Sequence, residues 1–180
     1  SIHGLEKFQD FGYVNSILRS EYFPPKDLWL TPFTVNYYYF GHLITAVLTK
    51  LSFLKPEVTF NLMLATLFSL TFTGSFSIGA NLWHFFTQSG DSGKARMTIK
   101  IILCGFLAAF LVTLAGNLHS IYAFFESYTP ESPVPFWQLK PDLNFSGYWY
   151  PNATRFIPFT IHEFPLYSFV VSDLHGHVLN

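Results

Sequence analysis

The sequence predicts an all-α, polytopic integral membrane protein with two full transmembrane spans, an interfacial helix and extracytoplasmic loops. Of its 180 residues, 50% are hydrophobic and 20% are aromatic, but only 12% are charged. A soluble domain usually carries about a quarter charged residues, so this chain could not easily cover a water-facing surface. The second observation is that two stretches, 58–90 and 101–125, contain no Asp, Glu, Lys or Arg. Each is longer than the roughly 20 residues that a transmembrane helix needs.

Charge and cysteine content exclude several classes of protein. The net charge of -1 supplies no basic surface for a phosphate backbone, so no nucleic-acid partner is expected. Cys104 is the single cysteine, which excludes an internal disulfide and a cysteine-based zinc site. The chain does not start with Met, and we expect it to be a fragment of a longer protein.

Residues 1–36 are predicted to form an extracytoplasmic acidic loop with a short amphipathic helix. Glu6 and Asp10 stand four residues apart, so a helix places them on one face. There they could bind a cation, or one carboxylate could act as a general base. They could equally be the solvated start of a helix, facing the positive end of its dipole. Pro24 and Pro25 break the helical pattern.

Residues 37–58 are predicted to form an interfacial or re-entrant helix. Polar residues interrupt the apolar stretch Tyr37–Leu54, and Lys50 lies well inside it. Tyrosine and lysine are typical of the boundary between membrane and water. The sequence therefore favours a helix that lies in the interface.

Three consecutive tyrosines begin this segment, and they are candidates for substrate binding together with a histidine. Tyr37, Tyr38 and Tyr39 cannot all face one way, so some rings are expected at the headgroup level. One or two hydroxyls could instead point into a cavity with His42 and form hydrogen bonds with a polar substrate. Both roles stay open at this point.

Residues 59–119 are predicted to hold two transmembrane helices, Phe60–Trp83 and Ile101–His119, joined by a basic cytoplasmic loop. At about 1.5 Å of rise per residue, the first would extend roughly 36 Å and cross the hydrocarbon core with some tilt. Glycines recur in both spans, and small residues allow close helix contact in lipid. The alternative is two buried helices in a soluble core, but such helices rarely stay free of charge for so long.

Positive charge in the connecting segments sets the predicted orientation. Lys94, Arg96 and Lys100 crowd the short loop between the spans, and such loops stay in the cytoplasm. The N-terminal segment and residues 120–163 then lie outside, and Tyr37–Leu54 does not cross. If Tyr37–Leu54 were a full span instead, the two polar segments would lie on opposite faces.

Residues 120–163 are predicted to form an extracytoplasmic aromatic, proline-rich loop, and residues 164–180 the start of a further membrane helix. The composition of the loop favours irregular structure over helix. Near its end stand three candidate substrate-binding residues, Arg155, His162 and Glu163. The planar guanidinium of Arg155 suits a phosphate group.

The closing segment carries a candidate metal site at Asp173, His175 and His177. In an extended backbone the three side chains point to one side and offer the N and O ligands that a divalent metal ion prefers. Ionisable groups in an apolar context at membrane depth usually mark function. The alternative is a helix capped by Asp173, with both histidines facing the outside water.

Three blocks of the sequence together resemble the YYY membrane-protein family (Chlor_Arch_YYY domain), large polytopic proteins of unknown function. The blocks are EKFQDFGYVNSILRSEYFPPKDLWL, NYYYFGH and HEFPLYSFVVSDLHGHV. They occur in the order of the family, and the resemblance spans most of the chain. It implies that this segment is the early part of a long multi-span protein.

That family is similar, more distantly, to polyprenyl-phosphate-dependent glycosyltransferases of the GT-C type, such as protein mannosyltransferases. This resemblance implies a GT-C-like fold in which an acidic residue of the first external loop acts as base or metal ligand. Asp10, with Glu6 beside it, matches that residue by position, and the Asp173 motif matches a second acidic loop more loosely. Neither an Asp-Glu nor an Asp-X-Asp pair is present, which leaves the base and the metal open.

The leading hypothesis from the sequence is therefore a multi-pass glycosyltransferase of the cell membrane with a polyprenyl-phosphate sugar donor. Asp10 would accept the proton of the acceptor, and Arg155 with His162 would hold the lipid phosphate. The rings of Tyr37–Tyr39 would line the groove for the sugar or the polyprenyl chain. The alternatives are a transporter, in which embedded His and Asp residues relay protons, and a non-catalytic membrane scaffold.

Overall fold

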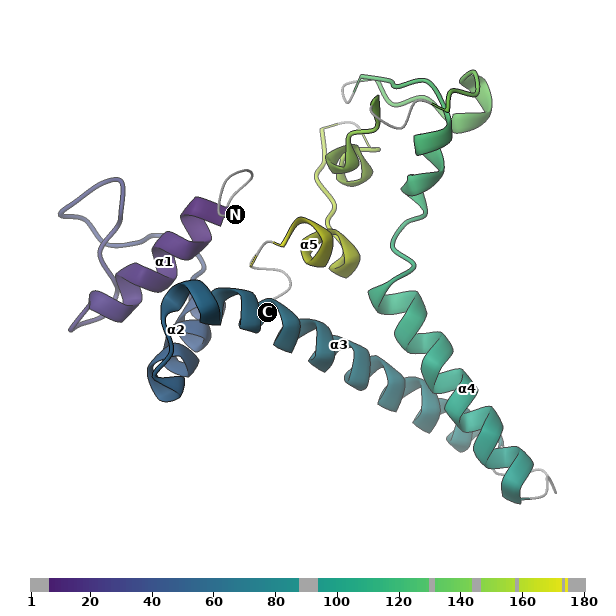
Figure 1. Cartoon of the computed structure of the whole chain (residues 1–180), viewed down its shortest axis with the longest axis horizontal. Helices are drawn as coiled ribbons and strands as arrows, with labels where there is room; N and C mark the ends of the chain where they lie inside the picture. Colours follow the sequence, from purple (N-terminus) through teal and green to yellow (C-terminus); the bar gives the residue numbers. More distant parts are fainter. Residues whose placement is uncertain are drawn as a thin grey trace. The chain divides into compact units, whose positions relative to one another are not determined.

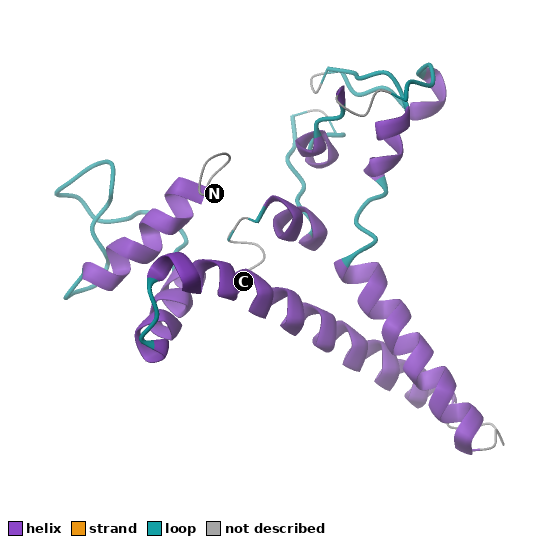
Figure 2. Cartoon of the chain, viewed as in Figure 1, coloured by secondary structure: helices purple, strands orange, loops and turns teal. Residues whose placement is uncertain are grey.

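A computed structural model describes residues 7–87, 94–129, 132–143, 147–157, 159–172 and 174. They form five α-helices, α1 (Lys7–Arg19), α2 (Phe40–Ser52), α3 (Pro56–Thr87), α4 (Lys94–Thr113) and α5 (Pro165–Val171), and the short 3-10 helices η1 (His119–Phe124), η2 (Phe136–Gln138) and η4 (Tyr150–Thr154) (Figure 1). The described residues contain no strand, only two isolated bridges (Figure 2). The predicted all-α class is confirmed for this part of the chain.

The chain divides into two compact units, and each is described by itself. The first holds Ser1–Gly74 with Ser168–Asn180, and the second holds Ser75–Tyr167. The divisions fall inside α3 and inside α5. The first unit therefore contains α1, α2 and the first half of α3, while the second contains the rest of α3, α4 and the aromatic segment.

Helices α1 and α2 pack on one another in the first unit. Val14 and Ile17, spaced three apart on α1, are buried against Ala46 of α2. This spacing gives α1 one apolar face, which is why the segment folds as a helix against a partner. The helix ends at Arg19, a few residues before the Pro24-Pro25 pair that cannot continue it.

Helix α2 begins later than the predicted segment and is short. Its first residue is Phe40, so the three tyrosines precede the helix. It ends at Ser52 and is capped by Phe53, whose φ of 56° lies in the left-handed region. Its 13 residues rise about 20 Å, which is less than the hydrocarbon core of about 30 Å. A hydrogen bond of 2.7 Å between the hydroxyls of Thr49 and Thr59 joins it to the start of α3. The interfacial location of this helix stays a prediction.

Helix α3 is long and apolar enough to cross a membrane. It contains 32 residues, and only 17% of its most apolar window is buried, whereas the core helix of a soluble protein would be mostly buried. The predicted span Phe60–Trp83 lies inside it. Among the described residues no other helix meets the same length and hydropathy, because the apolar part of α4, Met97–Thr113, is shorter. The second crossing therefore stays a prediction.

The predicted end of the second span is wrong. Helix α4 begins at Lys94 and ends at Thr113, and His119 starts the 3-10 helix η1 instead of closing the span. The reason lies at Gly116, whose φ of +56° is a left-handed conformation that glycine adopts without strain and that terminates helices. The residues after Thr113 therefore belong to the aromatic segment.

Small residues bring α3 and α4 close together in the second unit. A Cβ at Gly79 would lie 2.4 Å from Cβ of Ala108 and 3.0 Å from the carbonyl oxygen of Cys104. One turn away, the ring of Phe76 covers Gly105 and packs edge-on against Phe106, with ring centroids 5.1 Å apart. The contact depends on the absence of a side chain at position 79.

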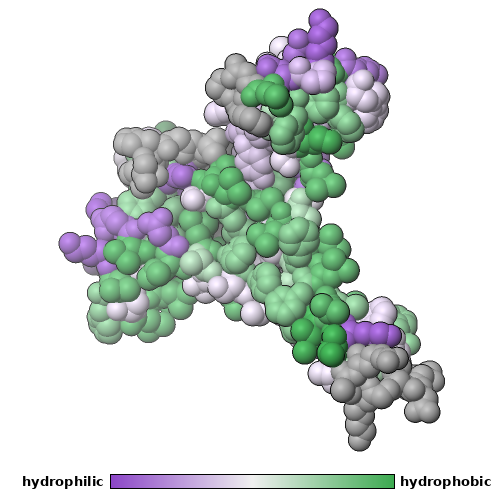
Figure 3. All heavy atoms as spheres, turned by 45° about the vertical axis from the view of Figure 1, so that its right-hand side comes forward, coloured by the Kyte–Doolittle hydropathy of each residue, from purple (hydrophilic) through white to green (hydrophobic). Residues whose placement is uncertain are grey.

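The outward faces of α3 and α4 are apolar. Large hydrophobic side chains stay exposed on both helices, among them Leu70, Ile78, Leu103, Phe106 and Leu107. Hydrophobic residues dominate the face in Figure 3, and hydrophilic ones gather in separate patches. A surface of this kind is unfavourable in water, but lipid solvates it.

The described part of the C-terminal segment packs on α3. Helix α5 has seven residues, and the ring of Phe169 meets Phe68 edge-on at 5.2 Å. Leu174 is fully buried in a cluster with Phe60 and Met63. The predicted further membrane helix continues into residues outside the described ones and stays a prediction.

Candidate functional site

A buried carboxylate–imidazole pair joins α1 to α2. Nε2 of His42, in the first turn of α2, lies 3.0 Å from Oδ1 of Asp10 on α1 and donates a hydrogen bond to it. Asp10 is 3% exposed and His42 is 1% exposed. A carboxylate in this position fixes the orientation and tautomer of the ring and stabilises its protonated form. The pair can therefore hold or move a proton.

Aromatic rings connect this pair to the protein surface. Tyr13 meets His42 edge-on with ring centroids 5.4 Å apart, and Tyr37 lies 5.9 Å from Tyr13. Tyr37 and Tyr38 pack together at 3.9 Å, and their hydroxyls share a hydrogen bond of 2.5 Å. Both are exposed. The chain of rings runs from the buried imidazole to hydroxyls that a ligand could reach.

The structure brings together four of the residues that the sequence singled out, Asp10, His42, Tyr37 and Tyr38. Tyr39 turns away and stacks on Phe23 at 6.5 Å. Its ring also packs against the apolar core between α1 and α2, so its role there is structural.

The other predicted site residues lie outside the described residues or in the second unit. Glu6, Asp173, His175 and His177 lie outside the described residues. Arg155, His162 and Glu163 belong to the second unit, where Arg155 is exposed and the other two are half-buried. Within the described ranges no group of three His, Cys, Asp or Glu side chains could hold a metal ion. The divalent metal therefore stays a prediction.

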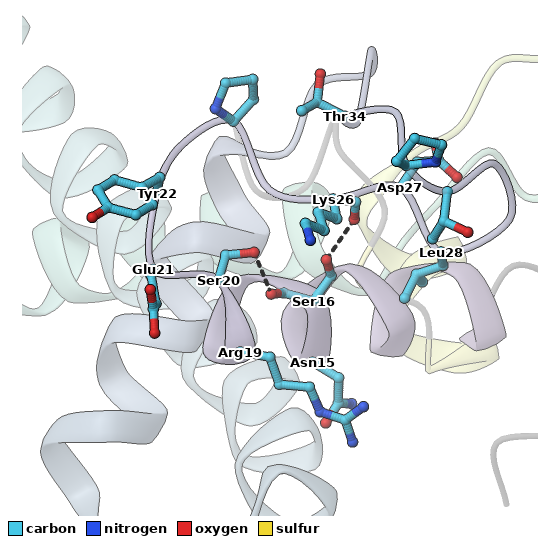
Figure 4. Close-up of a pocket in the computed structure, with 13 residues that line it drawn as sticks. Asn15, Ser16, Arg19, Ser20, Glu21, Tyr22, Lys26, Asp27, Leu28 and Thr34 are labelled. Carbon is cyan, nitrogen blue, oxygen red and sulfur yellow. Dashed lines mark hydrogen bonds between the residues drawn. The ribbon is translucent and has the colours of Figure 1, made fainter.

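A polar cavity of about 530 Å³ lies between α1 and the segment that follows it (Figure 4). The segment is closed onto the helix by a 2.6 Å hydrogen bond from the Ser16 hydroxyl to the carbonyl oxygen of Lys26. A second bond of 2.9 Å, from the amide of Val35 to the carbonyl oxygen of Pro25, holds its two sides together. The volume is within the range of small-molecule sites.

The lining of this cavity carries two cationic side chains, Arg19 and Lys26, and two anionic ones, Glu21 and Asp27. In Figure 4 the Lys26 side chain extends into the space between α1 and the loop, whereas Arg19 points away from it. Lys26 is exposed and forms no ion pair with any described residue. Oδ1 of Asp27 is already engaged, since it accepts hydrogen bonds from the amides of Trp29 and Leu30. The ammonium group of Lys26 is therefore available for a phosphate.

A second polar centre lies in the aromatic segment of the second unit, at His119. Its Nδ1 is 3.0 Å from the hydroxyl of Tyr148, and its Nε2 is 2.5 Å from the hydroxyl of Tyr128. The ring stacks on Tyr122 with centroids 4.5 Å apart. Burial lowers the pKa of His119 to about 4. Burial also raises the pKa of Tyr128 and Tyr148 to about 12, with a smaller effect of neighbouring tyrosines. The cluster is neutral at physiological pH.

The pKa of His119 predicts a stability loss in mild acid. The unfolded chain takes up a proton near pH 6.5, but the folded chain does so only near pH 4. Between these values the unfolded state binds more protons, so the free energy of unfolding falls as the pH drops from about 6.5 toward 4. The melting temperature of the detergent-solubilised protein should therefore drop more steeply in this window than that of a His119→Phe variant. Parallel curves would contradict the assignment.

Sequence reasoning missed several residues of these sites. The sequence predicts His119 as the end of a span, and no sequence pattern singles out Tyr13, Lys26, Tyr128 or Tyr148. The tyrosine-rich composition of the loop was a usable signal for the His119 cluster. The role of Lys26 depends on the path of the loop around α1, which no local pattern indicates.

The length and hydropathy of α3 and the exposed apolar surface of α3 and α4 are those of a helical membrane protein in contact with a lipid bilayer. The chain belongs to a family described as uncharacterized membrane protein (DUF2298), whose model matches residues 1–180. No curated protein and no solved structure matches the chain significantly.

Proposed function

We propose that this protein is a membrane glycosyltransferase that moves a sugar from a lipid-phosphate donor, of the polyprenyl type, to an acceptor on the extracytoplasmic side. The observation that carries the proposal is that α1 alone serves two polar sites. Its first half holds Asp10 against His42, and its second half forms one wall of the cavity that contains the Lys26 ammonium. Transfer from a lipid phosphate needs both a proton acceptor and a cation for the leaving phosphate.

In this proposal Asp10 and His42 act together on the proton of the acceptor. The carboxylate orients the imidazole, and the imidazolium that forms is stabilised by the same carboxylate. Tyr37 and Tyr38 line the approach for the sugar or the lipid chain, because their rings lead from the pair to the surface. A divalent metal at Asp173, His175 and His177 would be a further part of the same proposal.

The proposal assigns the phosphate first to Lys26. Its ammonium lies in the unit that contains Asp10, whereas Arg155 and His162 belong to the other unit. Arg155 stays a candidate on its chemistry alone, because an exposed guanidinium binds phosphate through two parallel hydrogen bonds.

The test is sugar transfer by the intact protein in liposomes, with radiolabelled lipid-phosphate sugars as donors. We expect the label to leave the lipid fraction, and Asp10→Asn to slow this by about 10²–10⁴-fold, the usual contribution of a general base. Lys26→Ala should raise KM for the donor, while Lys55→Ala, which removes an exposed lysine outside the cavity, should not. Retained transfer in Asp10→Asn would defeat the catalytic assignment.

The burial of the pair favours a second candidate, a proton-coupled transporter. Ionisable groups that are shielded from water inside a membrane protein often relay protons, and Asp10 and His42 are both almost fully buried. This candidate predicts proton flux in sealed liposomes that is lost in Asp10→Asn, without any turnover of lipid-linked sugar. Turnover without flux would exclude it.

A further inference from the structure

A second cavity, distinct from the one against α1, lies in the aromatic segment. Its volume is about 770 Å³, which suits a ligand of drug or lipid size. Its walls come from η1, η2, Ile157 and His162, and they include the rings of Tyr122, Phe136, Trp137 and Phe156. The proposed function makes no use of this space.

The wall of the cavity is a preformed aromatic framework. His119 stacks on Tyr122, and the rings of Phe136 and Phe156 each lie about 6 Å from Tyr122, at 6.2 Å and 6.0 Å. The hydroxyls of two tyrosines outside the cavity lining bind both nitrogens of His119. Because the framework is braced in this way, little ordering is needed when a ligand enters.

The chemistry of the lining selects an uncharged, mostly apolar ligand. Among the residues that the structure describes, no Asp, Glu, Lys or Arg lines the cavity. His119 contributes neither charge nor a vacant nitrogen, because it is neutral and both nitrogens are engaged. The other side chains of the lining that carry polar atoms are Asn117, Ser120, Tyr122, Trp137 and His162. The buried Nδ1 of His162 has no hydrogen-bond partner among the described residues. A charged ligand would lose its water here without compensation.

The position of the cavity favours a ligand that comes from the membrane. Asn117, the first residue of its lining, follows the end of α4 by only four residues. Exposed apolar side chains continue from α4 to the cavity through Leu111, Leu114, Leu118 and Ile121. The last two of these line the cavity itself. These side chains offer apolar contacts to a hydrocarbon chain at the end of α4 and in the cavity.

We propose that this cavity binds the hydrocarbon chain of a membrane lipid whose polar end is uncharged, such as a long-chain alcohol. The chain packs among the rings of Phe136, Trp137 and Phe156, and its hydroxyl lies near the polar side chains of Ser120 and His162. This inference concerns the second unit alone and does not depend on sugar transfer.

The test is photolabelling of the intact protein in liposomes with a long-chain alcohol that carries a diazirine at mid-chain. We expect saturable labelling of peptides from 117–124, 136–137 and 156–162, with competition by the unlabelled alcohol. The phosphate ester of the same alcohol should label these peptides less, because the described lining residues include no Lys or Arg. Preferential labelling by the phosphate ester would overturn the proposal.

A matched pair of variants tests the site itself. Ile157→Trp introduces a large ring into the lining and should remove the saturable labelling. Ile161→Trp makes the same change at an exposed isoleucine four residues away, outside the lining, and should leave the labelling intact. Both positions are exposed, so neither change disturbs a packed core. Equal labelling of both variants, or labelling confined to α3 and α4 without saturation, would contradict the proposal.

Discussion

Replacing Asp10 by Ala is expected to lower the free energy of unfolding by about 1.5–3 kcal/mol, the contribution of a hydrogen bond to a charged group. The imidazole of His42 would stay buried at the α1–α2 contact without the carboxylate that binds its Nε2. His42→Ala should be similarly costly, because it removes the other partner. Denaturant or thermal unfolding of the detergent-solubilised protein measures both changes.

Gln9→Ala is the control for this experiment. Gln9 lies next to Asp10 on α1, and its Nε2 donates a 2.8 Å hydrogen bond to the hydroxyl of Tyr13. Loss of this partly buried bond should cost only about 1 kcal/mol. If Asp10→Ala were no more harmful than Gln9→Ala, the pair would not hold α1 to α2. Asp10→Asn keeps a hydrogen-bond acceptor and a similar shape, so it is the better variant for activity measurements.

Gly79→Val should separate α3 from α4 and lower the free energy of unfolding by about 1–3 kcal/mol, the usual cost of overpacking. The added Cβ would overlap Ala108, and the neighbouring carbonyl of Cys104 belongs to the backbone and cannot swing aside. Unfolding in mixed micelles with increasing SDS would measure the loss.

Gly74→Val supplies the matched control in the same helix. A Cβ at position 74 would have no atom within 4 Å. Gly74→Val therefore changes helix propensity by the same amount as Gly79→Val but disturbs no contact between helices. We expect Gly74→Val to be at least as stable as the wild type. Equal destabilisation by the two substitutions would show that propensity, and not the close approach of the helices, sets the cost at position 79.

The parts of the fold that local composition determines could be predicted, and the parts that depend on tertiary contacts could not. The apolar helix that contains Phe60–Trp83 was predictable, because a run of this length without charged residues is typical of a membrane-spanning helix. The end of α4 was missed because hydropathy continues past it. The residues that indicate the end of the helix are Gly116 and the following Asn117, since glycine commonly occupies the position where a helix stops.

The residue types of the candidate site could be predicted from the sequence, but the pairing of Asp10 with His42 could not. The sequence singles out Asp10 because Glu6 stands four residues before it. It singles out His42 for a different reason, the three tyrosines nearby. Their hydrogen bond joins residues 32 positions apart, and it depends on the packing of Val14 and Ile17 on Ala46. No periodicity specifies such a contact. The same holds for His119, whose two tyrosine partners come from distant parts of an irregular segment.

The most direct test of the Asp10–His42 unit is turnover of lipid-phosphate sugar by Asp10→Asn, His42→Gln and the double variant in matched liposomes. Residues that act as one unit are not additive, so we expect each single change to slow turnover by about 10²–10⁴-fold and the double change to be no worse. Undiminished turnover in Asp10→Asn, at the folded fraction of the wild type, would contradict the proposed role of the pair.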